Sequence, residues 1–199
     1  MKINIASTSP GRQQMNGFTL IEMIGVLAVI AILAALLIPK VTSAISDARV
    51  NSTVGSYQAI QAAAAGHYAK YNSFDLSTNS MVLPPPITTF DSTVLLPEGF
   101  LDQPFSAKSG TSAVVQLVAG GGNAGGVGYK LDGSNVGTGA NAFTVECVIT
   151  GVTAQDALDI AARVDGNLAN NNVINTDILG GKVVWSHTTG TMYMYVAGR

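Results

Sequence analysis

The hydrophobic pattern divides the chain into a long apolar run, an amphipathic stretch and a region of short alternating segments. Residues 18–38 are almost wholly apolar. At about 1.5 Å per residue they are long enough to cross a bilayer core of about 30 Å. A single charge, on Glu22, interrupts this run, which ends at Pro39. The pattern therefore predicts a membrane-spanning helix that carries one carboxylate near its start.

From Val41 onward the spacing becomes helical and amphipathic. Apolar and aromatic residues recur every three or four positions, at Val50, Val54, Tyr57, Ile60, Ala64, Tyr68 and Tyr71. We expect one helix over about residues 19–72, kinked or loosened at Pro39 because proline lacks an N–H and clashes with the preceding turn. The stripe predicts that the second half of the helix packs on a globular head. His67 is expected there as a helix–head contact and not as a ligand.

The remaining residues predict an α+β head, in which an antiparallel sheet with one additional short helix lies on the long N-terminal helix. Thr153 and Asp156 resemble a capping box, and Ala157, Leu158, Ala161 and Val164 line one face of the short helix. The expected elements are a connector over 73–92 that includes Pro84, Pro85 and Pro86, turns with buried apolar residues over 94–105, strands over 112–119 and 143–150, the short helix over 153–166, and a β-hairpin of 182–187 with 191–197.

Charge is scarce in this chain. Charged residues make up 11% of it, against the usual quarter, and the net charge is −2. Because no cluster of Lys and Arg is present, we expect no nucleic-acid interface. A surface of Ser, Thr, Asn and Gly suits a subunit that packs against copies of itself. The lone Cys147 excludes an intramolecular disulfide and is expected to be a buried strand residue.

No motif predicts an enzyme. Residues 120–125 satisfy GxGxxG after a strand, but the sequence that follows is too rich in glycine for the helix that a dinucleotide site requires. Neither His67 nor His187 belongs to a recognisable nucleophile–base pair. Asp165, Asn167 and Asp177 are weak calcium candidates, since their loop lacks the EF-hand spacing. We therefore expect a solvated loop there and no cofactor.

The apolar run has two ordinary interpretations. A secretory signal peptide has an apolar region of about 7–15 residues followed by an A-x-A site, whereas this run is longer and ends LLIPK. A plain signal anchor leaves Glu22 unexplained. Basic residues lie on both sides of the run, so they do not decide its orientation.

The stretch 17–22, GFTLIE, resembles the processing motif of type IV pilins and type II secretion pseudopilins. The resemblance implies a leader over 1–17, cleavage after Gly17 by a prepilin peptidase, and N-methylation of Phe18. Counted from Phe18, Glu22 is the fifth residue and Pro39 the twenty-second, as is common in that family. The resemblance covers the chain to about residue 70.

The same resemblance implies a role for Glu22. Cleavage gives Phe18 a positive α-amine, and Glu22 lies one helical turn away. We expect Glu22 to neutralise this amine, in a neighbouring subunit or in its own, because an unpaired charge in a low dielectric is costly. A carboxylate that reaches the headgroups is the alternative.

The resemblance further implies four segments: the leader 1–17, a membrane and polymerisation half-helix 18–39, an amphipathic half-helix 40–72 and a head 73–199. The chain would sit in the bacterial inner membrane as a single-pass protein with its head outside the cytoplasm. Its partners would be membrane lipid, the prepilin peptidase and methyltransferase, an assembly platform, and other pilins in a type IV pilus or a type II secretion pseudopilus. A minor tip pilin whose head binds a ligand, a surface or DNA is the alternative. Many pilus-forming relatives close a C-terminal loop with a disulfide, which Cys147 alone cannot form.

Overall fold

The structure, a computed structural model, describes residues 17–74, 86–120, 129, 131, 143–166 and 178–198, with the backbone alone at 178–180. The chain forms two compact units, residues 1–43 and 44–199, and the long helix contributes to both. The four segments expected from the sequence stay predictions.

Helix α1 (Leu20–Tyr71) confirms the long N-terminal helix. It continues through Pro39, where Thr42 Oγ1 donates to the Pro39 carbonyl at 2.9 Å and Ser43 Oγ donates to the Lys40 carbonyl at 3.0 Å. The kink expected at Pro39 stays a prediction. By length and composition this helix can cross a membrane, and its most apolar window buries no residue.

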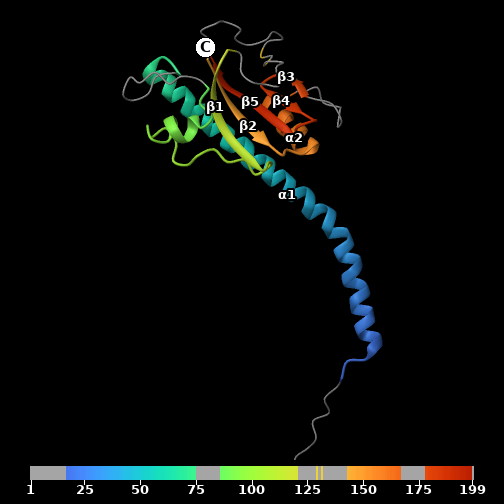
Figure 1. The fold of residues 1–199 in the computed structure, drawn as a ribbon. Helices are drawn as coiled ribbons and strands as arrows, with labels where there is room; N and C mark the ends of the chain where they lie inside the picture. Colours follow the sequence, from blue (N-terminus) through green and yellow to red (C-terminus); the bar gives the residue numbers. More distant parts are fainter. Residues whose placement is uncertain are drawn as a thin grey trace, which may run out of the picture. The chain divides into compact units, whose positions relative to one another are not determined.

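The head contains a five-stranded antiparallel sheet (Figure 1). Its order is β1 (Ser112–Ala119), β2 (Phe143–Thr150), β5 (Thr191–Gly198), β4 (Val183–Ser186) and β3 (Ile178–Gly180). β1 and β2 pair along their whole length, from Ser112 opposite Thr150 to Ala119 opposite Phe143. The α+β fold predicted from the sequence is therefore confirmed, as are both long strands and the β4–β5 hairpin.

The core lies between one face of this sheet and the second half of α1 (Figure 1). Alternate residues of β2, namely Val145, Cys147 and Ile149, are fully buried in it. From α1 the buried residues are Val50, Thr53, Tyr57, Ile60, Ala63, Ala64 and His67. Val54, Tyr68 and Tyr71, which the stripe predicted as core, are half-buried, because the buried face is rotated toward the small residues.

Helix α2 (Ala154–Asp165) confirms the predicted short helix, and Thr153 Oγ1 caps it by accepting from the Asp156 N–H at 3.2 Å. Its buried residues are Asp156, Ala157, Ile160 and Ala161, whereas Leu158 and Val164 are half-buried. The Asp156 carboxylate accepts from Ser46 Oγ at 2.8 Å, on α1. In a full capping box this carboxylate would accept from the backbone N–H of Thr153, but in this structure it binds Ser46 of α1 instead.

Two elements were not predicted. A five-residue π-helix, η1 (Asp91–Leu95), forms where a connector and turns were expected, although Val94 and Leu95 are buried as predicted. β3 follows the expected polar loop and adds an edge strand to the sheet next to β4. The predictions on Pro84 and Pro85, on residues 121–125 of the glycine-rich motif and on the loop 167–177 lie outside the described residues.

Candidate processing and assembly segment

Thr19 and Glu22 close the start of α1 with reciprocal hydrogen bonds. Glu22 Oε2 accepts from the Thr19 backbone N–H at 2.8 Å and from its hydroxyl at 2.6 Å. The Glu22 N–H donates in turn to Thr19 Oγ1 at 3.4 Å. This is a capping box, which satisfies N–H groups that the first turn of a helix leaves without partners. Sequence reasoning missed it, although the spacing T-x-x-E was available as a signal.

Gly17 and Phe18 lie immediately before this capped turn, outside the helix. Phe18 is 78% exposed, and a Cβ added at Gly17 would meet no atom within 4 Å. The Gly17–Phe18 peptide bond is therefore accessible and free of helical hydrogen bonds. Both properties suit an extended chain that has to enter the active site of a peptidase.

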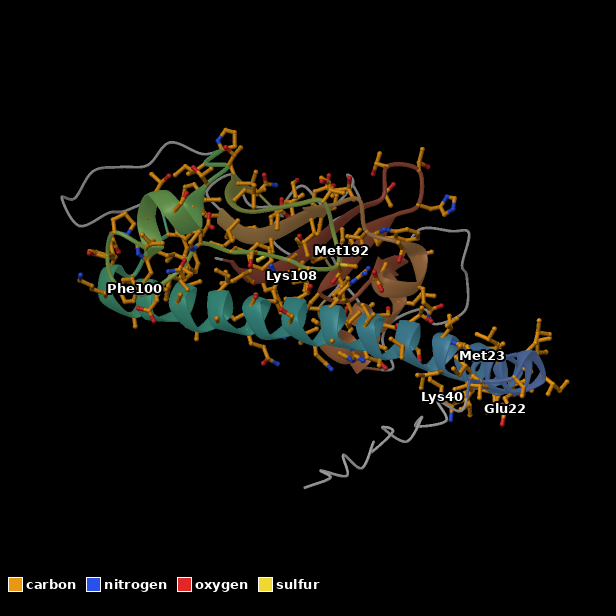
Figure 2. All side chains as sticks on the ribbon, turned by 90° about the horizontal axis from the view of Figure 1, so that it is seen from below. Glu22, Met23, Lys40, Phe100, Lys108 and Met192 are labelled. Carbon is orange, nitrogen blue, oxygen red and sulfur yellow. The ribbon has the colours of Figure 1, made fainter. Side chains whose placement is uncertain are left out.

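Beyond the cap, α1 presents apolar side chains on every side. The large ones from Leu20 to Ile38 are all between 48% and 77% exposed. Monomeric soluble proteins rarely expose contiguous apolar patches above a few hundred Å². Lipid or the same segment of another subunit is the kind of surface that covers such a helix. In Figure 2, Glu22 and Met23 mark the start of this segment and Lys40 its end.

In the head, His67 is a contact between α1 and the segment after η1, as predicted. Its Nδ1 lies 2.9 Å from Glu98 Oε2, and both side chains are buried. The rings of Tyr71, Phe90 and Phe100 surround it. Its Nε2 has no hydrogen-bond partner in the part of the chain that the structure describes. His187 is exposed in the β4–β5 turn, 5.7 Å from the Trp185 ring, so the fold keeps the two histidines apart.

A buried polar cluster that the sequence did not predict lies on the other face of the sheet. Glu146 is fully buried and accepts from Gln116 Nε2 at 2.5 Å and from the Tyr129 hydroxyl at 2.6 Å. Burial, and then the negative charge of Glu146, raises the pKa of Tyr129 well above its usual range. Because side chains alternate along β2, Glu146 points to the face of the sheet opposite to that of Cys147. Nothing in the glycine-rich sequence around Tyr129 predicts that the tyrosine ring covers Glu146.

Cys147 faces the core and is free and fully buried, as predicted. Burial, followed by the charges of Asp91 and Glu146, raises the pKa of its thiol well above the usual value. A thiol in this state is a packing residue and a poor nucleophile.

Of the calcium candidates, the structure describes Asp165. Its two oxygens accept from the backbone N–H groups of Lys182 and Val183 at 2.8 and 2.9 Å. Gly181 takes a φ of 76°, and a Cβ there would lie 2.5 Å from Asp165 Oδ2. Burial raises the pKa of Asp165, against the lowering effect of these hydrogen bonds. Asp165 thus fixes the β3–β4 turn, while Asn167 and Asp177 lie outside the described residues. No group of three metal-ligating side chains occurs within the described ranges.

Comparison with known proteins places the family signal at the N-terminus. A family model described as the prokaryotic N-terminal methylation motif matches residues 12–38. The chain is 46% identical over 52 residues to the type II secretion system core protein G of Pseudomonas aeruginosa, a match that covers 26% of this chain and 37% of that protein. The match therefore spans little more than a third of the relative's length. No solved structure matches the chain.

The matched region contains Gly17, Phe18, Thr19 and Glu22 together with the exposed apolar helix. These findings support the pilin and pseudopilin class. Within that class, the named relative is a type II secretion pseudopilin, and the similarity to it extends over the N-terminal portion alone. Cleavage after Gly17, methylation of Phe18 and the roles of Glu22 and Pro39 stay predictions.

Proposed function

We propose that this chain is a non-enzymatic structural subunit, a pilin or pseudopilin. It is made as a precursor, cleaved after Gly17, N-methylated at Phe18 and assembled through α1 into a type IV pilus or a type II secretion pseudopilus. The observation that carries this proposal is the capped start of an exposed apolar helical segment, Leu20 to Ile38, within a prepilin-type methylation motif. In this proposal the head, whose described residues hold a packed core, forms the coat of the filament.

The position of the capping box supports cleavage next to the helix. Thr19 and Glu22 fix the first turn from within the segment that remains after the leader is removed. The hydrogen bonds of this cap use no residue before Thr19. A peptidase can remove the leader without unwinding α1, because the Gly17–Phe18 bond lies outside the helix.

Charge explains why assembly requires the cut. A carboxylate at a membrane-embedded position usually has a partner, because desolvation makes an unpaired charge expensive. Cleavage creates a cation at Phe18, and Glu22 has acceptor capacity beyond its bonds to Thr19, since a carboxylate offers about four lone-pair sites. The Phe18 amine of a neighbouring subunit then pairs with Glu22 and fixes the register of two apolar helices.

The proposed location follows from the same helix. The chain crosses the bacterial inner membrane once, with its head outside the cytoplasm, and leaves it when the assembly platform adds the subunit to a filament. Inside lipid, helices associate mainly through packing and polar contacts, because lipid tails already solvate apolar side chains. The partners are copies of this chain, other pilins or pseudopilins, and the processing enzyme.

Processing is tested by replacing Gly17. The Gly17→Leu variant adds a branched side chain at the cleavage position, and we expect it to retain residues 1–17. Gly25→Leu is the matched control, because a Cβ at either glycine meets no atom within 4 Å. Mass spectrometry of the membrane protein should find a methylated Phe18 terminus in the wild type and in the control. A wild-type protein that retains Met1 in cells with an active prepilin peptidase would overturn the proposal.

A further inference from the structure

The segment 100–109 runs antiparallel to the second half of α1. Ser109 Oγ lies 2.6 Å from Thr53 Oγ1, and the Phe100 ring lies 6.0 Å from the ring of His67. A Cβ added at Gly66 would come within 3.0 Å of Phe100. Figure 2 shows Phe100 beside the last turns of α1 and Lys108 farther back along the helix. Two hollows that share no lining residue lie along this line, one toward each end, and we call this pair of hollows the groove.

The end of the groove nearer the C-terminus of α1 is a cavity of about 530 Å³. Small side chains of α1, including Ser56, Ala59 and Ala63, form one wall, and residues 100–106 form the other. Asp102 is exposed among the lining residues. Within the described residues, its carboxylate has no hydrogen bond or ion pair. This end of the groove is therefore apolar and carries one uncompensated negative charge.

The other end has the opposite charge. Arg49 and Lys108 border a second depression of about 370 Å³ together with Ile45 and Ala48. Both cations are exposed, and neither has a hydrogen bond or ion pair among the residues that the structure describes. In contrast, Arg163 on α2 is paired with Asp47 at 2.9 Å. The charged residues that line the two hollows thus differ in sign, with Asp102 toward the C-terminal end of α1 and Arg49 and Lys108 toward its N-terminal side. Lys70 lies over the Phe100 ring at the Asp102 end but does not line the hollow.

We propose that this groove is the surface through which the heads of successive copies contact each other, with Asp102 of one copy facing Arg49 and Lys108 of the next. The inference rests on the proposed function, because it needs copies aligned along α1. The two charged ends are about a dozen residues apart on α1, or about 18 Å at 1.5 Å per residue. A copy displaced along the helix by about that distance has its Arg49 and Lys108 level with Asp102 of the first copy, and a rotation about the filament axis turns these residues toward each other.

This contact joins two different patches of the same molecule. Such a heterologous contact does not close on itself unless the rotation happens to form a ring, so its repetition gives an open helical filament. The hollow at the Asp102 end also offers exposed apolar side chains, namely Ala59, Ala62 and Pro104. Charge complementarity selects the register, and the apolar surface supplies contact area.

Cysteine crosslinking tests the contact directly. A full chain with Asp102→Cys and Lys108→Cys should form a ladder of covalent multimers when filaments are oxidised, because each copy then joins two neighbours. Either single substitution should stop at the monomer. Asp102→Cys with Thr188→Cys is the matched control, since Thr188 is exposed in the β4–β5 turn and lies outside the groove. The native Cys147 is fully buried and does not contribute.

Charge reversal gives an independent measurement. Asp102→Lys, or Arg49→Asp with Lys108→Asp, should lower filament yield about tenfold, and the three substitutions together should restore most of it. Filaments at the wild-type level without a ladder, or with crosslinks to a different protein alone, would overturn this inference and leave the proposed function standing. A chain that is absent from all filaments would overturn both.

Discussion

Glu22 accepts two hydrogen bonds from Thr19, at 2.8 and 2.6 Å, and so closes the first turn of α1 in the chain that still carries its leader. The carboxylate therefore has a local partner before the Phe18 amine exists. Two roles follow for one side chain. It caps the helix through its oxygen atoms, as the structure shows, and it neutralises the amine through its charge, as we propose.

Glu22→Gln separates these two roles. Glutamine can keep the reciprocal cap, because its amide oxygen accepts from the Thr19 N–H, but it has no charge to pair with an amine. We expect membrane insertion and cleavage after Gly17 to stay near the wild-type level in both Glu22→Gln and Glu22→Ala. Filament yield, measured on immunoblots of sheared filaments against total protein, should fall at least tenfold in both variants. Wild-type yield from Glu22→Gln would show that the cap alone is what assembly needs.

The buried cluster around Glu146 makes a prediction about head stability. Tyr129→Phe removes the hydroxyl that donates to Glu146 Oε2 at 2.6 Å, so a buried carboxylate loses one of its donors. Urea unfolding of the full chain in detergent should show a loss of about 1–3 kcal/mol. Tyr193→Phe is the control, because Tyr193 belongs to the same face of the sheet and its hydroxyl has no hydrogen bond among the described residues. Equal stability of the two variants would contradict the role given to Tyr129.

The sequence predicts those parts of the fold in which hydrophobic residues follow a recognisable pattern along the segment. Residues 143–150 alternate except at Val148, residues 112–119 form a short apolar run interrupted by Gln116, and both strands form where expected. β3 has three residues, too few for an alternation to be recognised. The capping residue Thr153 was predicted correctly, but the Asp156 carboxylate binds Ser46, a partner far away in the sequence that no local rule identifies.

The same distinction applies to the candidate site. Gly17, Phe18 and Glu22 form a continuous motif, so the sequence alone singles them out. The contact between Tyr129 and Glu146 joins residues that are far apart in the pattern, and no period or motif predicts it. The charged groove likewise becomes visible after folding places residues 100–109 beside α1.

Because the head contains a buried cysteine thiol and buried tyrosine hydroxyls, we predict that it loses stability at alkaline pH. Burial raises the pKa of Cys147, Tyr57, Tyr129 and Tyr195 above their ordinary values of 9.0 for the thiol and 10.0 for the phenols. A group whose pKa is higher in the folded state holds its proton more tightly when folded. Its contribution is therefore fully present below the ordinary pKa and is lost as the pH rises toward the folded-state pKa.

We expect the free energy of unfolding to fall as the pH rises above about 9, the ordinary pKa of the thiol. The Cys147→Ala variant should show a shallower fall between about pH 9 and 10, because one of the titrating groups is gone. Urea denaturation at a series of pH values measures both slopes. A free energy of unfolding that stays constant or increases over this range would contradict the assignment of these groups to the core.

From the hydrogen bonds of Asp165 we predict that calcium has little effect on the thermal stability of the head. Both of its oxygens already accept backbone N–H groups from the β3–β4 turn. We expect the midpoint of thermal unfolding to be the same within about 2 °C in millimolar calcium and in EDTA. Asp165→Ala should lower stability by about 1–3 kcal/mol under both conditions, since it leaves two turn N–H groups without their acceptor. A calcium-dependent rise of several degrees that Asp165→Ala abolishes would restore the calcium hypothesis.

The central claim is that this chain polymerises after processing at Gly17. Quantitative mass spectrometry of purified filaments tests it most directly, by counting the N-terminal peptide of the chain against total filament protein. The account predicts many copies per filament, each beginning at a methylated Phe18. A filament that lacks the chain, that contains it with residues 1–17 still attached, or that holds one or two copies at its tip would contradict it.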